Sequence, residues 1–134
     1  MRHQLLFATL PVLMLVGCAQ APTTADATAD FCQNLASLKQ ELASLGTLTP
    51  NSTVGEFNTT RDRIKIAFDK LNRSATVLQN VKVDDLKKAE ENFNKTVSNI
   101  SPKDTLADAA TQVQQAGAEV EAARAQVSST VSCP

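Results

Sequence analysis

Apolar residues recur every three or four positions along most of the chain, and this spacing leaves little choice of fold. The clearest run has steps of four, three, four and three residues: Phe31, Leu35, Leu38, Leu42 and Leu45. A period near 3.6 places such residues on one face of an α-helix. Only 4 Gly and 5 Pro interrupt the 134 residues, so an all-α domain is predicted.

The repeat divides into four predicted helices, which cover residues 31–45, 53–78, 84–100 and 101–131. Gly46 follows the first run directly and is a residue type that often ends helices. Thr53 and Glu56 have the spacing of a capping box at the start of the second. Four helices joined by short loops predict an antiparallel up-down-up-down four-helix bundle.

The starts of the last two helices are predicted from residue type. Asp84 and Asp85 suit a helix N-terminus, where the helix dipole favours negative charge. Ser101 before Pro102 is typical of a capping residue followed by a first-turn proline, and so opens the fourth helix. Gly117 is a weak point inside that helix, at which a bend is expected.

Three cysteines, Cys18, Cys32 and Cys133, make an odd number. Cys32 lies in the first turn of the first predicted helix, and Cys133 lies just after the fourth. In an antiparallel array these two ends meet only if the number of helices is even. A disulfide between Cys32 and Cys133 is therefore predicted; the alternative is two separate buried thiols.

The N-terminus has the pattern of a secretory leader. Positive charge at Met1–His3 precedes the twelve-residue run Leu5–Val16, which is apolar except for Thr9 and Pro11. A helix of that length spans about 18 Å, well short of the roughly 30 Å hydrocarbon core of a bilayer. The leader is therefore expected to be removed rather than to remain as a membrane span.

The end of this leader, Leu15-Val16-Gly17-Cys18, resembles the lipobox of bacterial lipoproteins. The resemblance implies cleavage before Cys18, a thioether-linked diacylglycerol on its sulfur and anchoring on the extracytoplasmic side of a bacterial membrane. Ala19, which is not Asp, implies the outer membrane if the host is Gram-negative. The alternative is ordinary leader cleavage nearby.

The predicted organisation of the chain follows from this leader. Residues 1–17 are a removed signal peptide, 18–27 a lipidated N-terminus with a flexible tether, and 28–134 the helical domain. Two or three acyl chains bury enough CH₂ groups to hold a protein stably on a bilayer.

Composition argues against several functions. His3 is the single histidine and is lost with the leader, and the chain has no Trp or Tyr, so the usual general base and metal ligand are missing. We expect no enzyme activity, no metal and no cofactor besides the lipid on Cys18; a carboxylate-based hydrolase remains an alternative. The net charge of −1 offers no basic excess for nucleic acid.

Two groups of residues are candidate contact sites. Arg61 and Arg124 fall on predicted apolar seams, where they could together form an anion or head-group pocket; alternatively, their stems cover the core edge while each guanidinium reaches water or a carboxylate. Ile66, Val77 and Val81 gather on the other side of the second helix as a possible partner strip, or as part of a wider core.

Two neighbouring carboxylates in the third helix, Glu90 and Glu91, are predicted to lie on a solvated face. With Lys87 and Lys88 they form a charged run, in which Lys87 and Glu91 are an opposite-charge pair four residues apart.

The mature part resembles small, uncharacterised secreted proteins and lipoproteins familiar from actinobacteria. The resemblance rests on Phe31-Cys32 followed by Leu35 and Leu38, on 105–113 and on 129–133. It implies architecture only. The expected function is a non-enzymatic structural or interaction role in the bacterial envelope, through an unknown envelope protein or polymer. The alternative is a carrier that opens around an apolar ligand, a lipid or pigment, with walls from three phenylalanines: Phe57, Phe68 and Phe93.

Overall fold

The computed structural model describes residues 23–78, 81–101 and 103–134, and within these ranges it contains helices and no strands. Its elements, in chain order, are α1 (Thr24–Ala43), the short 3-10 helix η1 (Ser44–Thr47), α2 (Val54–Val77), α3 (Asp84–Ser98) and α4 (Leu106–Val131). The predicted all-α, four-helix architecture is confirmed.

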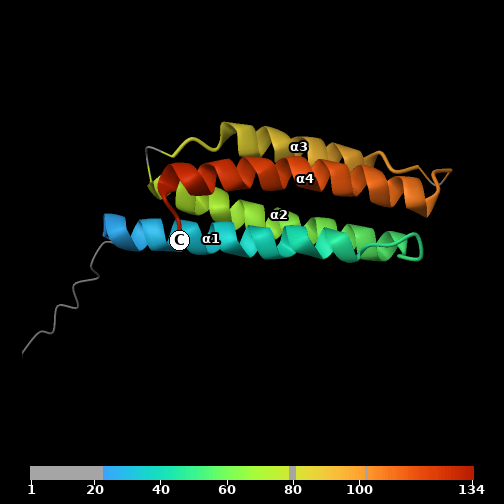
Figure 1. Cartoon of the computed structure of the whole chain (residues 1–134), viewed down its shortest axis with the longest axis horizontal. Coiled ribbons are helices and arrows are strands. Elements are labelled where there is room, and N and C mark those ends of the chain that lie inside the picture. The colour runs from blue at the N-terminus through green and yellow to red at the C-terminus, as the bar shows by residue number, and fades with distance from the viewer. Residues whose placement is uncertain (1–22, 79–80, 102) are drawn as a thin grey trace, which may run out of the picture.

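The helices form two antiparallel hairpins, α1 with α2 and α3 with α4, which lie against each other along their length (Figure 1). The start of α1, the end of α2, the start of α3 and the end of α4 lie together at one end, which we call the disulfide end. The opposite end, with η1 and the α3–α4 connection, is the loop end. Of the sequential neighbours, α2 and α3 touch each other least.

A capping residue fixes the start of α2, and acidic residues occupy the first turn of α3. The Thr53 side chain accepts a hydrogen bond from the Glu56 backbone N–H at 3.1 Å, and Glu56 accepts one from the Thr53 N–H, so the predicted capping box is confirmed. Asp84 and Asp85 occupy the first turn of α3, also as predicted.

The predicted tether is too long at its C-terminal end. A second capping box, formed by Thr23 and Asp26, starts α1 at Thr24, so residues 24–27 are helical and Ala27 is buried. The boundary predicted between 27 and 28 is therefore wrong. The error arose because the repeat of large apolar side chains begins only at Phe31, whereas a small residue fills the first buried position.

The start predicted for the fourth helix is also wrong. The α4 N-cap is Thr105, whose hydroxyl accepts a hydrogen bond from the Asp108 N–H at 3.1 Å. Ser101 instead lies in a turn, where its own N–H donates to the Asp104 carboxylate at 2.7 Å. Both threonine and serine have an acid three residues on, so the spacing alone could not separate them.

One contiguous core runs between the two hairpins, and the predicted seams supply it. The largest side chains that are fully buried come from all four helices: Phe31, Leu35, Leu38, Ile64, Leu71, Leu86, Phe93, Val113 and Val120. Because these residues recur about every 3.6 positions, each helix buries one stripe of side chains against the other helices.

Gly117 allows η1 to pack closely on α4. A Cβ atom at this position would lie 2.3 Å from Cδ1 of Leu45. The Gln114 side chain fixes the same contact by donating hydrogen bonds to the backbone oxygens of Leu45 (3.3 Å) and Leu48 (3.2 Å). The helix α4 continues as α-helix through Gly117, so the residue serves close approach and does not interrupt the helix.

The predicted disulfide is confirmed. Cys32 and Cys133 are bonded with their Cα atoms 5.4 Å apart, although they are separated by 101 residues in sequence. Ser132, in the left-handed region at φ 59°, ends α4 and turns the chain toward α1. The bond thus closes the bundle at the disulfide end, on the side where α1 meets α4. No helix in the described part of the chain is long and apolar enough to span a bilayer.

Candidate functional site

A groove lies at the loop end, where the start of α2 meets the end of α3 and the start of α4. Its volume is about 440 Å³, which is within the range of small-molecule sites. Its apolar wall consists of six side chains: Val54, Phe57, Val97, Ile100, Leu106 and Ala109. Its polar side chains are Asn58, Arg61, Ser98 and Ser101. None of the described residues that line it carries a carboxylate.

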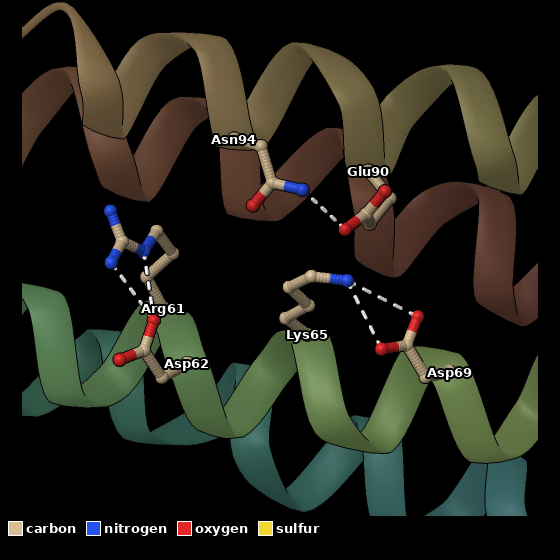
Figure 2. A network of polar contacts seen from close by, with 6 residues as sticks. All are labelled: Arg61, Asp62, Lys65, Asp69, Glu90 and Asn94. Carbon is tan, nitrogen blue, oxygen red and sulfur yellow. Dashed lines mark hydrogen bonds and ion pairs between the residues drawn. The ribbon is translucent and has the colours of Figure 1, made fainter.

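Arg61 is the charged residue of the groove. Its side chain is 29% exposed, and its Nε and Nη2 atoms donate to Oδ1 of Asp62 at 3.0 and 2.9 Å. The Asp62 side chain is mostly in solvent, so the pair is of the exposed kind that contributes little stability. Figure 2 shows the guanidinium reaching into the space between α2 and α3.

Arg124 lies in a different part of the bundle. It is buried on α4, where Nε and Nη2 donate to the two Glu121 oxygens at 2.7 and 2.8 Å. It follows the groove residue Ala109 by fifteen positions along one helix, which is about 22 Å. The predicted joint pocket of Arg61 and Arg124 is therefore wrong, and the alternative, in which each guanidinium finds a carboxylate, holds.

A polar cluster occupies the middle of the same α2–α3 seam (Figure 2). Glu90 is only 7% exposed, and Nδ2 of Asn94, one turn later on α3, donates to its Oε1. Across the seam, Lys65 pairs with Asp69 along α2, with Nζ 3.0 Å from Oδ2. Among the described residues no hydrogen bond joins α2 to α3, whereas Asn34 and Ser74 join α1 to α2 at 3.1 Å.

Burial raises the pKa of the Glu90 carboxyl. The Asn94 hydrogen bond and the positive charge of Lys65 favour the ionised form and lower the pKa, but less than burial raises it. The negative charges of Asp69 and Glu91 raise it further. Ionised Glu90 is therefore expected to lower the stability of the folded bundle.

The prediction that Glu90 lies on a solvated face is wrong, whereas Glu91 is exposed as expected. Glu90 is four residues after Leu86 and three before Phe93, both fully buried, so it belongs to the seam of α3. This spacing could have predicted that Glu90 is buried, but the residue was assigned to the surface because it is charged.

The structure places only two of the three residues of the predicted partner strip on the surface of α2. Ile66 and Val77 are 56% and 57% exposed on α2, but eleven residues separate them, about 16 Å along the helix. Val81 lies beyond the end of α2 and is partly buried against the core. The third exposed large apolar residue is Val54, at 60%, which no prediction named and which lies on the wall of the groove.

The predicted ligand walls are mostly closed. Phe68 and Phe93 are buried in the core, and neither lines the groove; Phe57 alone of the three does. A ligand could reach Phe68 or Phe93 only if helices of the closed bundle moved apart. The groove at the loop end needs no such movement.

The described residues contain no group of three or more His, Cys, Asp or Glu side chains placed to hold a metal ion. The leader and Cys18 lie outside the described residues, so the lipidation site stays a prediction from sequence. No family model matches this chain, and no curated protein or solved structure matches it either.

Proposed function

We propose that the protein is a lipid-anchored bacterial lipoprotein of the cell envelope, which acts by binding and without catalysis. The observation that carries the proposal is the short distance in sequence between the lipobox cysteine, Cys18, and the capped start of α1 at Thr24. Six residues span at most about 21 Å. A lipid on Cys18 would thus hold the start of the folded bundle close to the bilayer.

This anchor would orient the molecule. The disulfide end would face the membrane, and the loop end would extend away from it by up to about 39 Å, the length of the 26-residue helix α4. The groove would then be presented outward, toward an envelope protein or polymer. The proposal includes the extracytoplasmic side of the membrane, the outer one in a Gram-negative host, and no nucleic acid partner.

Metabolic labelling with radioactive palmitate tests the anchor. We expect label in the wild-type protein and none in Cys18→Ala. Cys133→Ser is the matched control, because it removes a cysteine outside the lipobox, and should label as the wild type does. A wild-type protein without label, or equal label in Cys18→Ala, would remove the anchor from the proposal.

A second candidate function is that of a carrier for an apolar ligand, a lipid or pigment. The apolar wall of the groove favours it, because the wall remains open to solvent at Val54 in the closed bundle. Native mass spectrometry of the purified protein tests this. A stoichiometric small molecule retained by the protein supports the carrier, and the mass of the bare processed chain counts against it.

A further inference from the structure

We propose that the groove at the loop end binds a single-chain fatty acid, with the carboxylate at Arg61 and the hydrocarbon chain along the apolar wall. The inference rests on the binding role proposed above and names the ligand class. It does not rest on the lipid anchor, because the described chain begins at the disulfide end, with α1 starting at Thr24, whereas the groove is at the loop end.

The wall supplies the apolar half of the recognition. Phe57, Val97 and Ala109 are buried residues whose surfaces form the inside of the groove, while Val54 leaves an apolar rim in water. Covering such a surface with a hydrocarbon chain removes apolar area from water, which favours binding.

The charge of the groove supplies the other half. Arg61 is the only charged side chain among the described residues that line the groove, and its partner Asp62 is not part of the lining, so the groove presents one cation to a ligand. Asp62 occupies Nε and Nη2, and Nη1 makes no hydrogen bond to the described part of the chain. A ligand carboxylate can accept from Nη1, and the Asn58 amide lies three residues earlier on the same face of α2.

A fatty acid fits this groove better than a peptide does. Each residue of a peptide brings a backbone N–H and C=O that need partners when they are buried. The groove offers four polar side chains, and these lie beside a wall of six apolar ones. A fatty acid has a single polar group, its carboxylate, and its hydrocarbon chain needs no hydrogen-bond partners.

The test uses the full lipidated protein in phosphatidylcholine vesicles and a dodecanoic acid that carries a diazirine at the end of its chain. After illumination, we expect peptide mass spectrometry to find the label on the groove wall within 97–109, and unlabelled dodecanoate to compete with it. Arg61→Gln should raise the half-labelling concentration roughly tenfold, because it removes one charge-assisted contact. Arg63→Gln, which alters an exposed arginine on the same helix, should leave it unchanged.

Dodecanol with the same diazirine has the same chain but no charge, so it distinguishes recognition of the carboxylate from nonspecific apolar binding. The wild type should prefer the acid, and Arg61→Gln should lose that preference even if its fold is slightly weakened. Equal labelling by acid and alcohol in the wild type, equal effects of Arg61→Gln and Arg63→Gln, or label confined to 19–30 would overturn the inference. Flotation of the same vesicles reports on the anchor separately: protein that floats without groove label refutes the groove alone.

Discussion

The contact between Gly117 and Leu45 gives a sharp prediction. Gly117→Ala should lower stability when Leu45 is present and raise it when Leu45 is replaced by alanine. In Gly117→Ala the new methyl would lie 2.3 Å from Cδ1 of Leu45, well inside the 3.5–4.0 Å at which carbon atoms pack. Gln114 holds the backbone of Leu45 against α4, so the side chain cannot simply withdraw with its turn. Its Cδ1 atom must shift, and the buried surroundings of Leu45 leave it little room to do so.

The magnitude follows from two opposing terms. Replacing Gly by Ala inside a helix gains about 1 kcal/mol, and overpacking a core costs about 1–3 kcal/mol. Gly117→Ala alone should therefore lower the free energy of unfolding by about 1 kcal/mol. In a Leu45→Ala background, which itself costs about 2–5 kcal/mol, the clash is absent and Gly117→Ala should raise stability by about 1 kcal/mol. The coupling between the two sites is then about 2 kcal/mol.

Urea denaturation followed by far-UV circular dichroism measures these differences, since the chain has no Trp or Tyr to report by fluorescence. Gly55→Ala is the control, because its Cβ would meet only Thr53 Oγ1 at an ordinary 3.6 Å. It should not lower stability. If Gly117→Ala changed stability equally with and without Leu45, the close approach would not be the reason for the glycine.

Three further predictions concern stability. Because burial raises the pKa of Glu90 above its ordinary value of 4.5, the folded chain keeps this proton to higher pH than the unfolded chain does. Ionisation therefore removes stability as the pH rises through that range: Glu90→Gln should melt higher than wild type at pH 7 and equally at pH 4, whereas exposed Glu91→Gln should show no such pH-dependent gain. Serine at both Cys32 and Cys133 should lower the free energy of unfolding by about 3–5 kcal/mol, since a loop of 101 residues is released; a loss below about 1 kcal/mol in denaturation would contradict this. Thr53→Ala should cost about 1 kcal/mol in the same assay through loss of the α2 cap, and an unchanged midpoint would argue against it.

The sequence predicted the parts of the fold that depend on a repeat of large apolar side chains. Phe31, Leu35 and Leu38 lie on the buried face of α1 because steps of three and four keep them on one stripe. The disulfide could be predicted because its reasoning needs only an even number of antiparallel helices. Helix starts were harder to predict from the sequence, because an acidic residue follows three positions after each of three candidate caps, Thr23, Ser101 and Thr105.

Most of the candidate site could not be predicted from the sequence. Its groove depends on how three helices meet, and no spacing within one helix determines that. Arg61 was identified as an unusual seam residue, but its supposed partner, Arg124, lies about 22 Å along α4 from the groove residue Ala109. Glu90 was misassigned because its charge was given more weight than its place between Leu86 and Phe93.

The intact mass of the protein, extracted from its host envelope without reduction, tests the central claim most directly. We predict a chain that starts at Cys18, carries a diacylglycerol with or without an N-terminal acyl group, and lacks the two hydrogens removed by the Cys32–Cys133 bond. A mass that corresponds to an unmodified Cys18, or to a chain that starts elsewhere, would contradict the proposal of a lipid-anchored binding protein.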